Sequence, residues 1–143
     1  MNSFLLWSHP VIQIIAMLIG IFAMVQGAKR FAMQHGKKCL FPWKQHVKLG
    51  SAALILWIFG ATGFYVTHTV FEVTHITGIH AYLAWVIVIL SVFGLISGYV
   101  MNKIKKRRKV LPAVHGAANV ILLILILIEC YKGIWLMRDF LFD

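Results

Sequence analysis

Residues 79–101, IHAYLAWVIVILSVFGLISGYVM, run for 23 positions without an acidic or basic side chain. A bilayer core about 30 Å thick needs roughly 20 mostly apolar residues in a helix, so this stretch has the length of a membrane-spanning helix. Three more apolar segments of similar length lie at about 4–28, 46–67 and 112–137. We therefore predict an all-α, integral membrane four-helix bundle in which residues 1–143 form a single domain.

The composition agrees with this class. Hydrophobic residues make up 61% of the chain and charged residues 13%, which is more apolar than soluble domains are. Little chain lies outside the four segments, so we expect no soluble catalytic domain, and no P-loop, GxSxG or HExxH motif occurs. No positive residue precedes Lys29 and no small-residue cleavage pattern follows, so the first segment is expected to be a permanent helix and not a signal peptide.

The net charge of +10 is distributed unevenly along the chain. Six basic residues lie in or beside the first connection: Lys29, Arg30, Lys37, Lys38, Lys44 and Lys48. Six more lie in the third: Lys103, Lys105, Lys106, Arg107, Arg108 and Lys109. The acids fall on the other side: Glu72, Glu129, Asp139 and Asp143. This asymmetry predicts that both basic loops face the cytoplasm, that both termini face out, and that the cations meet anionic lipid headgroups, not nucleic acid.

The chain is expected to consist of two copies of a two-helix unit. In each half a basic loop is followed by a proline, Pro42 or Pro112, shortly before a histidine, His46 or His115. Proline suits the first turn of a helix because its missing N–H is not needed there. Pro10 lies directly after His9. It either starts the first helix or lies within its first turns, and the sequence does not decide between the two.

One histidine stands just inside the start of each segment, at intervals of 37, 34 and 35 residues: His9, His46, His80 and His115. Consecutive membrane helices run in opposite directions, so the first and third histidines share one face of the bilayer, and the second and fourth share the other. An imidazole pair near each face can coordinate one haem iron. We therefore predict two haem b groups, bound non-covalently because the chain has no CxxCH motif.

Glycines recur at positions related to these histidines. Eighteen residues make five helical turns and return to the same face of a helix. The residue 18 positions after His9, His80 and His115 is a glycine: Gly27, Gly98 and Gly133, respectively. The residue 18 positions after His46 is Phe64, next to Gly63. Three more lie within about 40° of the histidine face of their helices: Gly20, Gly60 and Gly94. We predict that these glycines make room for haem on the helices that do not ligate it. Close helix packing is the alternative.

Other polar residues leave alternatives open. His75 and His68 lie in the predicted outer loop, and either could replace His9 as a ligand, although solvated loop histidines are the simpler expectation. His35 lies in the first basic loop. Glu129 is expected to pair with Lys132, three residues later on the same helix, with a proton path for quinol oxidation as the alternative.

The histidine-bearing stretches resemble the cytochrome b561 superfamily. The matching segments are Ser8-His9-Pro10, Pro42-Trp43-Lys44-Gln45-His46, Gly78-Ile79-His80 and Leu111-Pro112-Ala113-Val114-His115-Gly116. The chain looks similar to small prokaryotic members reduced to four helices, over essentially its whole length. This resemblance implies an outer haem on His9 and His80, an inner haem on His46 and His115, and a prokaryotic inner or thylakoid-type membrane. The chain is too short for the ascorbate sites of eukaryotic members.

The function expected from these features is electron transfer across a membrane through two b-type haems. Electrons would be exchanged with the quinone pool or with a redox partner protein, and the chain would act alone, as a dimer or as a subunit of a larger complex. Because the net reaction needs an external donor and acceptor, the sequence does not decide whether the chain is an enzyme. The alternatives are a haem-free membrane anchor or assembly subunit and, less favoured, a metal or proton transporter.

Overall fold

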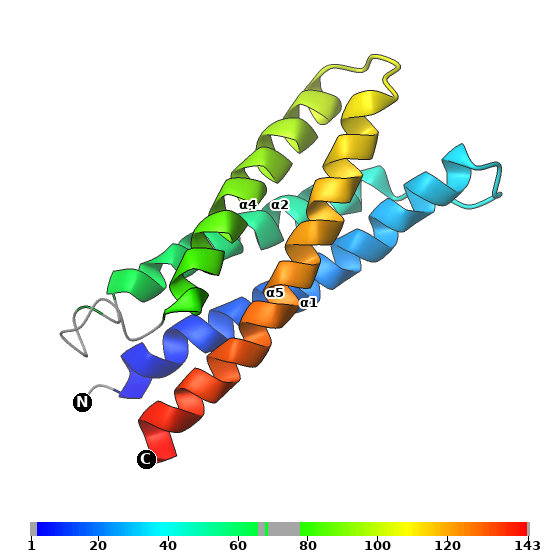
Figure 1. The fold of residues 1–143 in the computed structure, drawn as a ribbon. Helices are drawn as coiled ribbons and strands as arrows, with labels where there is room; N and C mark the ends of the chain where they lie inside the picture. Colours follow the sequence, from blue (N-terminus) through cyan, green and yellow to red (C-terminus); the bar gives the residue numbers. More distant parts are fainter. Residues whose placement is uncertain (1–2, 66–67, 69–77, 143) are drawn as a thin grey trace.

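A computed structural model describes residues 3–65, 68 and 78–142. Its elements are α1 (Ser3–Gln34), α2 (Trp43–Phe59), the 3₁₀ turn η1 (Gly60–Thr62), α4 (Ile79–Lys103) and α5 (Val110–Phe142) (Figure 1). The four α-helices pack as a bundle, and each is long and apolar enough to cross a membrane. The predicted all-α fold and the four membrane-length segments are thus confirmed.

The helix ends differ from the predicted ones. Helix α1 continues six residues past position 28, because its basic end is rich in good helix formers, and stops just before Gly36, whose φ of 80° favours glycine. Helix α2 begins at Trp43, directly after Pro42, and tightens into η1 at Gly60. Short 3₁₀ turns are common at helix ends. Pro10 lies inside α1.

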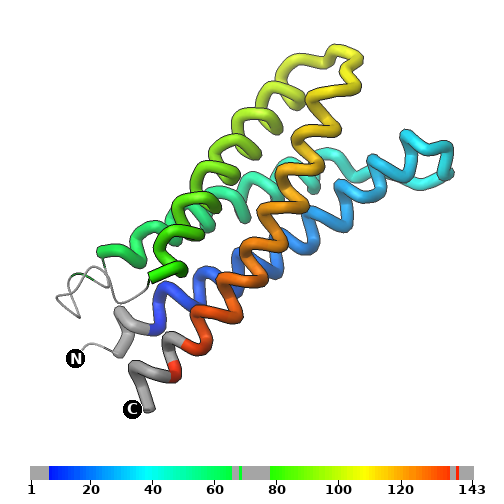
Figure 2. The backbone as a smooth tube through the Cα atoms, viewed as in Figure 1, coloured from blue at the N-terminus to red at the C-terminus, as the bar shows by residue number. Residues whose placement is uncertain are grey.

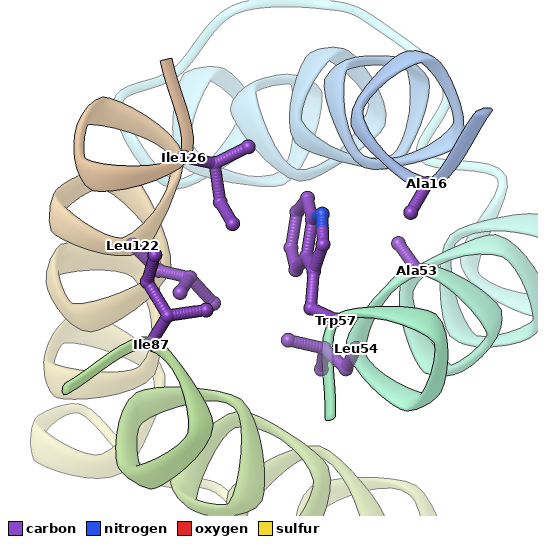
Figure 3. Close-up of a cluster of buried hydrophobic side chains, with 7 residues drawn as sticks. All are labelled: Ala16, Ala53, Leu54, Trp57, Ile87, Leu122 and Ile126. Atoms are coloured by element: carbon purple, nitrogen blue, oxygen red, sulfur yellow. The ribbon is translucent and has the colours of Figure 1, made fainter. Parts of the chain in front are cut away.

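The helices form two hairpins, α1–α2 and α4–α5. Helix α1 packs against α2 and α5, and α4 packs against α5 and α2, so α1 lies diagonally across the bundle from α4, and α2 from α5 (Figure 3). The tube in Figure 2 shows both basic connections at one end and both chain termini at the other. We call these the loop end and the termini end.

The hydrophobic core among the described residues is small. The Trp57 indole stands between the four helices, surrounded by smaller side chains (Figure 3). Those are Ala16, Ala53, Leu54, Ile87, Leu122 and Ile126. Gly20 allows the indole this position, since a Cβ there would come within 2.7 Å of Trp57 Cζ2. Large apolar side chains face outward instead, for example Phe22 at 63% exposure and Ile89 at 66%. An apolar exterior around a thin core is typical of a protein surrounded by lipid.

Candidate functional site

The structure brings His9 and His80 together at the termini end. His9 lies in α1 and His80 near the start of α4, on diagonally opposed helices, and both side chains are partly buried. Their ring centroids are 6.5 Å apart and their ring planes are inclined at 85°. The two imidazoles therefore face each other across the bundle axis, with helices α2 and α5 to either side.

Glu129 holds the His80 ring from the neighbouring helix α5. The carboxylate oxygen Oε2 pairs with His80 Nδ1, and Glu129 is only 7% exposed. The expected pair with Lys132 is therefore wrong. Glu129 continues the buried stripe of Leu122 and Ile126, so its carboxylate points into the bundle, where His80 lies.

His46 and His115 lie at the loop end on the other diagonal, in α2 and α5. His46 Nδ1 lies 2.9 Å from the backbone carbonyl oxygen of Ala23 in α1. A carbonyl oxygen can only accept a hydrogen bond, so Nδ1 of His46 carries the hydrogen. In the neutral imidazole, Nε2 is then the unprotonated nitrogen, with a lone pair for a metal.

His115 is held in the same way by a hydroxyl group. Its Nδ1 lies 2.8 Å from Ser97 Oγ, and the Ser97 hydroxyl donates to the carbonyl oxygen of Phe93 at 2.7 Å. When the Ser97 hydroxyl donates its one hydrogen to Phe93, Oγ accepts from a protonated Nδ1 of His115. In that tautomer, Nε2 of His115 is the free nitrogen.

His9 and His80 differ from the other two histidines. Nδ1 of each ring is buried and makes no hydrogen bond to a described group, although His80 Nδ1 contacts the Glu129 carboxylate. A buried polar atom without a hydrogen-bond partner carries a free-energy penalty of about 1–3 kcal/mol.

A glycine of the antiparallel partner helix faces each histidine. We measured how close a Cβ built on each glycine would come to Cε1 of the facing imidazole. The distance is 3.1 Å for Gly63 and His9 and 3.2 Å for Gly27 and His46. It is 3.9 Å for Gly133 and His80 and 3.6 Å for Gly98 and His115. The 18-residue spacing has a simple cause. In an antiparallel pair, the position five turns from one histidine is level with the histidine of the other helix.

The other three predicted glycines face side chains in this structure. Gly20 faces Trp57, Gly60 faces the Gln13 amide at 2.8 Å, and Gly94 faces Leu54 Cδ1 at 3.0 Å. All of these distances are measured from a Cβ built on the glycine. The role of the six glycines in haem packing stays a prediction.

The remaining histidines lie away from these pairs or outside the described residues. His35 is exposed, with Nδ1 2.9 Å from the Phe31 carbonyl oxygen, and His68 is exposed. His75 lies outside the described residues. The described residues contain no cluster of three or more side chains of the types that bind metal ions.

Cations from the two basic loops meet at the loop end. Lys105 Nζ, from the connection before α5, lies 4.4 Å from the ring centroid of Trp43 at the start of α2, and Lys44 Nζ lies 5.8 Å from it. Cation–π contacts of this kind occur within about 6 Å of a ring. The strongest concentration of positive charge is therefore on the same side as His46 and His115.

Two features of the site were not predicted from the sequence. Ser97 lies 18 residues before His115, at the level of that histidine on the antiparallel helix, and this spacing could have identified it. The Ala23 carbonyl carries no side-chain signal.

The comparisons identify no relative: no protein-family model, curated protein or solved structure matches the chain. The chain is thus assigned by its fold as a four-helix protein with four membrane-length apolar helices.

Proposed function

We propose that this protein is a dihaem cytochrome b of the cytochrome b561 type, which transfers electrons across a membrane. The observation that carries the proposal is the facing pair His9 and His80. Two imidazoles that share one metal ion through bonds of about 2 Å have ring centres roughly 6 Å apart, and the observed separation is 6.5 Å. The paired histidines would be the axial ligands of two non-covalent b haems.

The contacts that the other rings make through Nδ1 fit the same role. Metal-ligating histidines almost always donate their second ring N–H to a carboxylate, a backbone carbonyl or a similar acceptor. His80, His46 and His115 have Nδ1 beside a carboxylate, a carbonyl and a hydroxyl oxygen. These contacts orient the rings and leave Nε2 for iron. When bound, haem supplies one-electron Fe(III)/Fe(II) chemistry.

The proposal includes an orientation and a location. Both basic loops would face the cytoplasm and both termini the outside, so that His9 and His80 hold the outer haem and His46 and His115 the inner one. The membrane would be a prokaryotic inner or thylakoid-type membrane, and the two hairpins would be copies of one unit. Electrons would come from and go to the quinone pool or a redox partner protein.

The lack of charged groups at mid-depth favours electron transfer over the transporter alternative. The described buried residues between the two ends are apolar except for uncharged side chains such as Ser91. Transport of an ion or a proton through a membrane protein commonly uses ionisable residues along the path, whereas electron tunnelling needs none. A haem-free anchor, in turn, gives no reason for the partly buried imidazoles of His9 and His80 to face each other on diagonal helices.

Transfer across the membrane can be measured directly. Purified protein is reconstituted into phosphatidylcholine vesicles with ferricyanide trapped inside, and dithionite is added outside as the reductant. We expect the trapped ferricyanide to be reduced much faster than in protein-free vesicles, and the His46→Ala variant to lose this acceleration. If both haems are reduced while the ferricyanide stays oxidised, electron transfer across the membrane is the wrong function.

A further inference from the structure

We propose that Glu129 is a positioning residue that makes the two haem sites unequal in reduction potential. It holds His80 through Nδ1 and lowers the potential of the termini-end haem relative to the loop-end haem. This inference rests on the proposed function. It concerns a residue that sequence reasoning had placed in an unrelated ion pair.

Glu129 is built into the site and is not a surface charge. Among the described residues, Glu129 is the one buried side chain that is acidic or basic. One carboxylate oxygen contacts His80 Nδ1, while the other, Oε1, is buried and makes no hydrogen bond to a described group. A buried carboxylate is unfavourable unless a partner compensates it. A ligand histidine on an iron that gains positive charge is such a partner.

The loop end has no equivalent of this carboxylate among its described contacts. His46 is held by the Ala23 carbonyl and His115 by the Ser97 hydroxyl, and both acceptors are neutral. The basic residues near that end, such as Lys44 and Lys105, carry positive charge. The two sites thus share the same ligand type and differ in the sign of the charge around them.

Two effects of Glu129 act in the same direction. A carboxylate that accepts the second N–H of a ligand histidine makes the imidazole a more basic ligand. Its negative charge also favours the ferric state, which carries one more positive charge than the ferrous state, and this attraction is strong in a medium of low dielectric constant. Both effects lower the reduction potential of the termini-end site. In the half-reduced protein the electron would therefore reside mainly at the loop end.

The test is a potentiometric titration of Glu129→Gln in two single-haem backgrounds. In His46→Ala, which retains the termini-end haem, we expect the substitution to raise the potential by at least about 59 mV, a tenfold change in the one-electron equilibrium. In His9→Ala, which retains the loop-end haem, the same substitution should leave the potential almost unchanged. Glutamine keeps an oxygen acceptor for His80 Nδ1–H and removes the charge, so haem content should be retained.

Two control variants separate charge from packing. Glu129→Asp retains the charge and should shift the potential less than Glu129→Gln does. Lys132→Gln removes one charge from the same helix at a partly exposed position, and should produce a smaller shift in the opposite direction. Equal shifts for the Asp and Gln variants would overturn the inference, as would an unchanged potential in Glu129→Gln at full haem content.

Should Glu129→Gln fail to assemble, redox-difference infrared spectra of the unmodified protein provide the test. A carboxylate band should change in step with the termini-end haem, and its absence would overturn the inference. Failure of this inference can be distinguished from failure of the proposed function. If the proposed function is wrong, the purified chain contains no haem b. If only the inference about Glu129 is wrong, two haems are present and their potentials do not depend on Glu129.

Discussion

Replacing His46 or His115 by alanine is expected to remove the loop-end haem and leave the termini-end haem in place. Replacing His9 or His80 should have the opposite result. In the proposed arrangement each haem would have one ligand from each of two diagonal helices, so the loss of either imidazole would leave the iron with one protein ligand and a cavity. The measurement is the haem content per chain, together with the reduced spectrum of the remaining haem.

A surface histidine provides the matched control for these variants. His35 is exposed, follows the end of α1 and contacts the carbonyl oxygen of Phe31 in that helix, so His35→Ala should retain both haems. Full haem content in His9→Ala would contradict the assignment of His9 and would point to His75 or His68. Loss of both haems in every variant, with the helical content preserved, would contradict two independent sites.

Replacing Trp57 by alanine is expected to lower the stability of the bundle more than any other single core substitution. The indole is 5% exposed and stands where the four helices meet (Figure 3). Removing a buried tryptophan typically lowers the free energy of unfolding by about 3–5 kcal/mol, because the cavity cannot be refilled completely. The small neighbours Ala16, Ala53 and Gly20 have no side-chain atoms that could move into that space. Unfolding by SDS, followed by circular dichroism, measures the change.

Trp7→Ala is the control for this prediction. Trp7 is 51% exposed, so its loss should affect stability much less, although both variants remove the same atoms. Similar losses for the two variants would show that Trp57 does not fill the centre of the bundle. The comparison tests the packing between the two histidine pairs and does not depend on haem.

The sequence predicted the fold class because the dominant signal, four long apolar segments, is also the main physical constraint on a membrane protein. The predicted starts of the helices were also close to the observed ones. Pro42 and Pro112 mark the first turns of α2 and α5. The ends were less predictable. Good helix formers carried α1 past position 28 into the basic segment, and glycines near position 60 tightened the end of α2 into η1.

The sequence could predict which histidines the structure brings together at the termini end, but it could not predict the groups that contact the histidine rings. Regular spacing identified the four histidines, and the structure brings His9 and His80 to 6.5 Å. Glu129 was matched with Lys132 because a local i, i+3 partner is visible in a sequence, whereas His80, 49 residues away, meets it only through packing of α4 on α5. The Ala23 carbonyl has no sequence signature at all, because every residue has one.

The most direct test of the account is a reduced-minus-oxidised spectrum of the purified protein together with a pyridine haemochrome assay. The account predicts a sharp b-type band and two haems per chain, one for His9 with His80 and one for His46 with His115. One haem per chain would remove one of the two pairs. The absence of a b-type band would contradict the central claim and leave a haem-free membrane subunit as the function of this bundle.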